Sequence, residues 1–145
     1  LGIDVDIREE NRERIINHPF YNYIQMIKGS SIDDKVIDEV RRISKGYEKV
    51  LVLLDSNHTK EHVLKELEAY ANLVSVGSYC VVFDTIIEDV TNRELFSDRP
   101  WHPGNCPKNA VDEFMSGNKM FKIDHKINEK LLVSVAPNGY LKRIK

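Results

Sequence analysis

The chain has 145 residues, 41% of them hydrophobic and 30% charged, which is enough apolar material for the core of one domain and excludes wholesale disorder. Lysine and arginine number 21 against 23 aspartate and glutamate residues, a net charge of −2, so neither nucleic acid nor a membrane surface is an expected partner. The apolar runs are too short for a transmembrane span, and two cysteines form no disulfide framework. We therefore expect a reducing, cytoplasmic setting.

Strand-like and helix-like segments alternate in the first half of the chain. Residues 2–7 alternate apolar and acidic side chains, which predicts a strand, and residues 9–17 read as a short helix. A second strand is predicted over 23–27, and Asp33 or Asp34 is expected to cap the helix that follows. The five apolar residues Val50 to Leu54 predict a strand that is buried on both faces.

The second half continues this alternation and then changes character. A helix is predicted through Val63 to Tyr70, and a second fully apolar strand over 79–83. A polar loop follows over 88–107, and then a helix over 110–116. Residues 131–135 and 140–144 flank Pro137-Asn138-Gly139 and are expected to form an antiparallel hairpin. The pattern predicts a single α/β domain over 1–145 with a mostly parallel sheet. Because Leu1 already lies in a strand-like run, we expect the domain to be incomplete at its N-terminus.

Acidic residues stand at the ends of three predicted strands. They are Asp4 (with Asp6 nearby), Asp55 and Asp84. Ligands of open parallel sheets bind beyond the carboxyl ends of the strands. An acid after an early strand can accept hydrogen bonds from ribose hydroxyls, and Asp55 with Asp84 would suit Mg²⁺ or Ca²⁺. At each single position, a helix cap is an equally good interpretation.

Two histidines follow Asp55 closely. His58 lies three residues after it, so the imidazole is a candidate general base, and a surface histidine is the plain alternative. His58-Thr59-Lys60-Glu61-His62 also matches H-x-x-E-H, the motif of inverted zinc proteases. The buried strand before it suits a nucleotide-binding sheet better than a zinc-protease helix.

The segment Arg99 to Asn105 is rich in proline and contains the single tryptophan, Trp101. Long loops in compact domains are often lids, so Trp101, His102 and Asn105 are candidate substrate-loop residues. The alternative is an ordered loop with Trp101 packed on the core. None of the seven glycines forms a G-x-G-x-x-G or P-loop pattern.

Several of these segments resemble the cephalosporin hydroxylase family, which includes rhamnosyl O-methyltransferase-like proteins. The matching segments are Gly2 to Arg8, Lys28 to Ser31, Val50 to His58, Gly77 to Thr85, Arg99 to Asn105 (without His102) and Pro137 to Leu141. They cover nearly the whole chain in order. The resemblance implies a class I, Rossmann-like methyltransferase sandwich that uses S-adenosylmethionine and often a divalent metal.

The resemblance also implies roles for individual residues. Asp4 would bind the ribose hydroxyls, and Gly29, Ser30 and Ser31 would border the adenine. Asp55 would lie near the methyl donor and bind a metal with Asp84. His58 falls where catechol-type O-methyltransferases have a lysine base.

Two departures accompany the resemblance. The family's first strand and its glycine-rich turn are missing, which would leave an open position in the sheet. Related enzymes often carry two metal ligands side by side on the later strand, whereas Phe83 and Thr85 flank Asp84 here.

The sequence thus predicts an S-adenosylmethionine-dependent O-methyltransferase that acts on a small hydroxylated acceptor, such as a sugar or a natural product. Mg²⁺ or another divalent cation would assist the reaction, and the related enzymes imply a homo-oligomer. The alternatives are a non-catalytic nucleotide-binding or scaffold domain, and a zinc hydrolase that uses His58 and His62.

Overall fold

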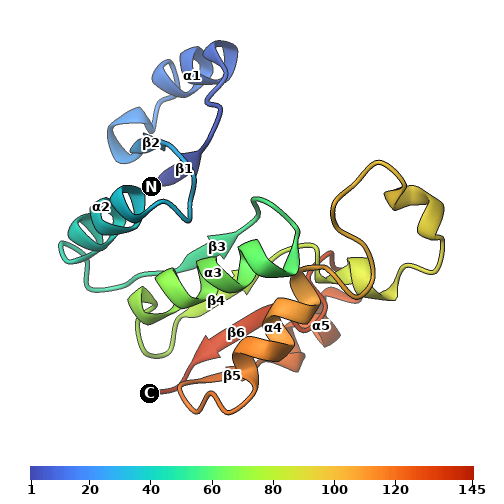
Figure 1. Ribbon diagram of the computed structural model, residues 1–145. Helices are drawn as coiled ribbons and strands as arrows, with labels where there is room; N and C mark the ends of the chain where they lie inside the picture. Colours follow the sequence, from blue (N-terminus) through green and yellow to red (C-terminus); the bar gives the residue numbers. More distant parts are fainter.

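The computed structural model describes all 145 residues, and its elements form two groups (Figure 1). The first group contains β1 (Gly2–Asp4), α1 (Glu9–Ile16), β2 (Met26–Lys28) and α2 (Asp34–Ser44), with a 3-10 turn at Tyr21–Tyr23. β1 and β2 run parallel, with Gly2 opposite Met26. α2 begins where the Asp33 carboxylate accepts a hydrogen bond from the amide of Lys35 at 2.9 Å. Asp33 is therefore the N-cap, which decides between the two predicted caps.

The second group is built on a four-stranded sheet. It contains β3 (Val52–Leu54), α3 (Lys60–Tyr70), β4 (Tyr79–Val82), α4 (Pro107–Met115), β5 (Phe121–Ile123), α5 (His125–Leu131) and β6 (Tyr140–Arg143), with 3-10 turns at Ala71–Leu73, Thr85–Asp89 and Arg93–Phe96. The strand order is β3-β4-β6-β5. β3 and β4 are parallel, whereas β6 is antiparallel to both β4 and β5. The fold is α/β as predicted, but the larger sheet is mixed rather than mostly parallel.

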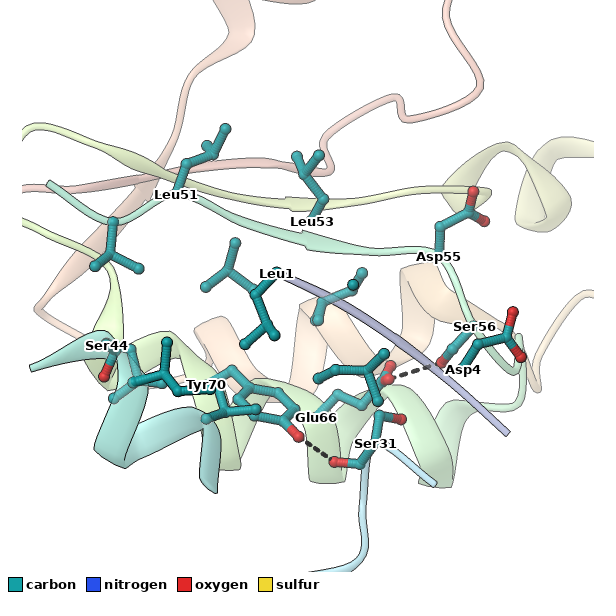
Figure 2. Close-up of a pocket in the computed structure, with 18 of the residues that line it drawn as sticks. Leu1, Asp4, Ser31, Ser44, Leu51, Leu53, Asp55, Ser56, Glu66 and Tyr70 are labelled. Atoms are coloured by element: carbon teal, nitrogen blue, oxygen red, sulfur yellow. Dashed lines mark hydrogen bonds between the residues drawn. The ribbon is translucent and has the colours of Figure 1, made fainter. Parts of the chain in front are cut away.

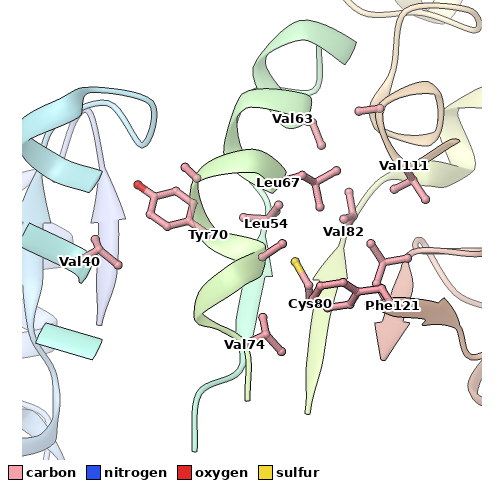
Figure 3. Close-up of a cluster of buried hydrophobic side chains, with 14 of the residues drawn as sticks. Val40, Leu54, Val63, Leu67, Tyr70, Val74, Cys80, Val82, Val111 and Phe121 are labelled. Carbon is pink, nitrogen blue, oxygen red and sulfur yellow. The ribbon is translucent and has the colours of Figure 1, made fainter. Parts of the chain in front are cut away.

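The main core lies between this sheet and the helices α3 and α4 (Figure 3). Leu67 of α3 and Val111 of α4 are fully buried, and they belong to one cluster with Val82 of β4. Val40 of α2 joins the same cluster beside Tyr70 of α3 (Figure 3). The apolar side of α3 therefore packs against both groups of elements.

A cavity separates the two sheets. β1 pairs only with β2, and β3 pairs only with β4, so each has one unpaired edge. All residues of both β1 and β3 line a cavity of about 1010 Å³ between these edges (Figure 2). The unpaired strands β1 and β3 therefore border one shared cavity.

The burial of β3 differs from the prediction. Leu54 is only 6% exposed, but Leu51 is 55% exposed and Leu53 is 58% exposed. Leu51 and Leu53 point away from α3, the helix that lies on the other side of the strand (Figure 2). The prediction of a strand buried on both faces is therefore wrong for β3 in this chain, because only one face is covered. The second strand also begins later than predicted, since residues 21–23 form a 3-10 turn.

The closing hairpin has a different first arm from the one predicted. Residues 140–143 do form β6, but its partner is β5, with Phe121 opposite Arg143. Residues 132–135 lie outside any strand, and Leu132 and Val133 are 88% and 89% exposed. Composition misled the prediction here. Residues 131–135 are apolar apart from Ser134 and so have strand character, but no strand edge lies beside them. None of the helices combines the length and the apolar character that crossing a membrane requires.

Candidate active site

Two aspartates follow the parallel strands of the larger sheet. β3 ends at Leu54 and β4 at Val82, and these two residues are register partners. Asp55 comes directly after β3 and Asp84 two residues after β4, so both stand at the carboxyl edge of the sheet. Asp84 adopts a left-handed backbone conformation with φ of 54°, where the chain leaves β4 and enters a 3-10 turn.

His58 lies between these two carboxylates. Its Nε2 atom is 3.4 Å from Oδ1 of Asp55 and 3.2 Å from Oδ2 of Asp84. One donor atom from each of the three residues lies within 4.8 Å of the others, a spacing that allows all three to reach one metal ion. The His58 side chain is 19% exposed, while that of Asp55 is 61% exposed, so the group opens to solvent on the Asp55 side.

The tryptophan of the proline-rich loop packs against this histidine. The rings of Trp101 and His58 meet edge to face with centroids 5.0 Å apart, and the guanidinium of Arg99 lies 5.4 Å from the Trp101 ring centroid. Trp101 also lines the cavity between β1 and β3. It therefore contacts both the three-residue group and the cavity, and it is not packed into the main core.

The other two predicted loop residues behave differently from each other. Asn105 fixes the loop to α3, because its side-chain oxygen accepts a hydrogen bond from the amide of Lys60 at 3.3 Å. Its side-chain amide donates to the carbonyl of Pro100 at 2.9 Å. His102 is exposed, and its Nδ1 atom lies 2.8 Å from the carbonyl oxygen of Pro103. The structure thus gives Asn105 a loop-fixing contact and leaves both His102 and Asn105 outside the cavity lining.

Glu88 supports the same loop, and no sequence pattern indicated this. Its Oε2 atom accepts hydrogen bonds from the amide of Gly104 at 2.8 Å and from the thiol of Cys106 at 3.3 Å. The bond from Gly104 is the main reason that the pKa of Glu88 lies below its ordinary value. Burial raises the pKa of Cys106 to about 11, so this thiol remains a donor at neutral pH.

The predicted cofactor-binding residues line one end of the cavity. Asp4 ends β1, Gly29 to Ser31 follow β2, and Asp55 follows β3; all of them border the same space. An added Cβ at Gly29 would lie 2.7 Å from a methyl carbon of Val36. A larger residue would therefore push this loop away from α2, which explains why glycine suits the position.

The second histidine of the H-x-x-E-H motif belongs to a different group. The Nε2 atom of His62 lies 3.1 Å from the hydroxyl of Ser31 and 3.6 Å from Oε1 of Glu66. Glu61 points to the surface and pairs with Lys65 at 2.7 Å. The group with metal-binding geometry contains His58 but not His62. The two histidines are therefore not arranged as a zinc pair, and the structure gives the zinc hydrolase alternative no support.

Glu66 and Tyr70 continue the side of α3 that carries His62. Glu66 is only 2% exposed, and its Oε1 atom accepts a hydrogen bond from the hydroxyl of Ser56 at 2.7 Å. The hydroxyl of Tyr70 donates to the carbonyl oxygen of Ser31 (Figure 2). Burial, with the nearby charge of Glu66, raises the pKa of Tyr70 to about 12. Tyr70 is therefore a stable donor throughout the physiological range.

The chain is similar to a family of known proteins. Residues 1–144 match the family described as Rhamnosyl O-methyltransferase/CmcI. Proteins named rhamnosyl O-methyltransferase from Mycobacterium bovis and Mycobacterium tuberculosis are each 30% identical to it over 121 residues. The aligned region covers 83% of this chain and 47% of each relative, so the chain spans about half the length of the curated relatives it matches. The family resemblance predicted from the sequence is confirmed by this match.

Proposed function

Because the chain belongs to the rhamnosyl O-methyltransferase/CmcI family, we propose that it forms the cofactor-facing part of an S-adenosylmethionine-dependent O-methyltransferase. The acceptor would be a small hydroxylated molecule, a sugar or a natural product, since the similar proteins are named for methyl transfer to a rhamnosyl group. The observation that carries the proposal is the meeting of Asp55, His58 and Asp84, because Asp55 also lines a cavity bordered by Asp4 and the Gly29 loop.

The lining of the cavity at the strand ends suits the methyl donor. Asp4 offers a carboxylate at a strand end, where two ribose hydroxyls can donate to it. Gly29, Ser30 and Ser31 offer a close backbone approach and two hydroxyls for the adenine side.

The carboxylates of Asp55 and Asp84 suit a hard divalent cation such as Mg²⁺. When bound, such a cation lowers the pKa of an acceptor hydroxyl and makes it a better nucleophile. His58 would take the hydroxyl proton through Nε2, the atom that faces both carboxylates.

Trp101 would close the acceptor side of the site. Its edge-to-face contact limits rotation of the His58 ring, and its position on the cavity lining lets it exclude water from the reacting atoms. Asn105 would hold this loop against the start of α3. Methyl transfer needs such alignment, because the nucleophile must approach the methyl carbon in line with the leaving sulfur.

The proposed fold is a Rossmann-like methyltransferase sandwich in which one strand is absent from this chain. The unpaired parallel edges of β1 and β3, with the exposed Leu53 beside them, favour an extended segment that lies parallel to both. Such a segment would complete the sheet and the cofactor cavity. We also propose a cytoplasmic homo-oligomer, for which the exposed Leu132 and Val133 offer apolar surface.

Calorimetric titration with S-adenosylmethionine, with and without Mg²⁺, tests the function. It should be done on this chain and on a form with a designed β-strand fused ahead of Leu1 through a flexible linker. Binding by the completed form, weakened in Asp4→Ala, would support the methyltransferase. Absence of binding by both forms would contradict it and favour the non-catalytic scaffold alternative.

The metal site has a separate test in the fluorescence of Trp101, the single tryptophan. Mn²⁺ at the Asp55 and Asp84 carboxylates would lie close enough to quench its emission, since Trp101 contacts His58. Asp84→Asn should abolish saturable quenching, whereas Asp89→Asn, an acid at the end of the following turn, should preserve it. Equal quenching in both variants would refute the metal assignment.

A further inference from the structure

One side of α3 carries three polar residues that all reach across to strand-end loops. His62, Glu66 and Tyr70 are spaced four residues apart, so they lie along one face of the helix. His62 contacts Ser31 in the loop after β2. Tyr70 also contacts Ser31, and Glu66 accepts from Ser56 in the loop after β3 (Figure 2). These three residues are called the α3 clamp below.

The clamp connects the two groups of elements beside the cavity. Ser31 belongs to the β1–β2 group and ends the loop proposed to border the adenine. Ser56 belongs to the β3–β4 group and directly follows Asp55, the proposed metal ligand. The 3.6 Å approach of His62 to Glu66 joins the two contacts into one chain of polar groups. The relative position of the two loops therefore depends on this side of α3.

Glu66 is poorly suited to a purely stabilising role. It is 2% exposed, and its Oε2 atom is buried without a hydrogen-bond partner. A buried carboxylate that is only half satisfied loses more hydration than its contacts return, and a leucine of similar volume would bury well at this site. Glu66 instead fixes the positions of its neighbours, because its Oε1 atom faces both the Ser56 hydroxyl and the His62 ring.

We propose that Glu66 is a positioning residue, which acts with His62 to hold the Ser31 loop and the Asp55–Ser56 strand end at the separation that S-adenosylmethionine requires. This inference rests on the proposed function for the identity of the ligand. It assigns no chemical step to Glu66, which lies outside the metal-binding group of Asp55, His58 and Asp84.

The test compares Glu66→Leu with Glu66→Gln and with Glu68→Leu, a matched change at an exposed position of the same helix. Glu66→Leu should leave the melting temperature unchanged or raise it, yet weaken S-adenosylmethionine binding at least about tenfold, equivalent to about 1.4 kcal/mol. Glu66→Gln keeps an oxygen that can accept from Ser56, so its affinity for S-adenosylmethionine should lie between those of Glu66→Leu and Glu68→Leu. Binding in Glu66→Leu equal to that in Glu68→Leu would overturn the inference.

His62 provides a second measurement that separates positioning from general stability. His62→Leu should weaken binding as Glu66→Leu does, and the double variant should be little worse than either single one, because both act through one contact chain. Additive losses, or a lower melting temperature in step with weaker binding, would contradict the proposal.

Amide hydrogen exchange makes the clamp testable without any ligand. The amides of Ile32 and Asp33 bond back to Ser30, so they report on the Ser31 loop. They should exchange at least about tenfold faster in Glu66→Leu than in Glu68→Leu, while the amides of β4 keep their protection. Unchanged exchange would overturn the clamp. If exchange rises but neither the wild-type chain nor the form completed with the fused strand binds S-adenosylmethionine, the proposed function fails and the clamp stands.

Discussion

Two adjacent leucines of β3 should differ sharply in what they contribute to stability. Leu→Ala removes three carbon groups, worth about 2.4 kcal/mol in total when fully buried, at about 0.8 kcal/mol each. Leu54 is 6% exposed, so it loses nearly all of this and also leaves a cavity under α3, for an expected cost of about 3 to 4 kcal/mol. Leu53 is 58% exposed, so less than half of the transfer free energy is at stake. Its truncation should cost about 1 kcal/mol and leave no enclosed cavity.

Urea denaturation followed by far-ultraviolet circular dichroism measures both costs. The free energies of unfolding of Leu53→Ala and Leu54→Ala are compared with that of the wild type at equal m-value. Leu53→Ala should cost about 2 to 3 kcal/mol less than Leu54→Ala. If both substitutions cost the same, the outer face of β3 is covered, and the reasoning about an exposed face is refuted. Adding the fused strand proposed above should increase the cost at Leu53 selectively.

Two further predictions concern alkaline pH and the closing turn. Burial raises the pKa of the Cys80 thiol to about 12, so the folded chain favours the protonated form. The resulting contribution to the free energy of unfolding is complete below about pH 9 and is lost as pH rises toward 12. Cys80→Ala should therefore flatten the decline of unfolding free energy over that range, and an unchanged slope would contradict the assignment. Gly139→Ala should cost about 2 kcal/mol or more, because its Cβ would collide with the Val82 carbonyl oxygen. Gly2→Ala, where a Cβ meets nothing, is the control; equal melting temperatures would refute the clash.

The parallel strands and their acidic ends could be predicted because local composition determines them. The apolar runs that contain β3 and β4 are short, uninterrupted and followed by polar residues, a pattern that is typical of parallel strands in a chain that alternates helices and strands. Asp55 and Asp84 then share an edge because parallel strands share a direction. The expectation that both faces of β3 are buried failed, since burial depends on a neighbouring element that composition alone cannot supply.

The contacts that depend on long sequence separation could not be predicted in the same way. The partner of β6 is β5, which precedes it by a whole helix, and the apolar residues 131–135 were a nearer but wrong choice. Glu66 looked like an ordinary helix residue, because nothing local shows that Ser56 and His62 face its carboxylate. Glu88 likewise supports a loop 16 residues away. Only the packed chain brings such partners together.

The backbone of Asp84 has a consequence for how easily this site can be lost. At φ of 54° Asp84 lies in the left-handed region, which glycine adopts without cost and which asparagine and aspartate tolerate better than other residues do. A single change to glycine would remove the remaining cost of this conformation together with a charge that faces His58. Selection for stability alone would therefore favour variants that have lost the carboxylate. Under the proposed metal site, a well-folded relative with glycine here would have lost one of the two carboxylate ligands.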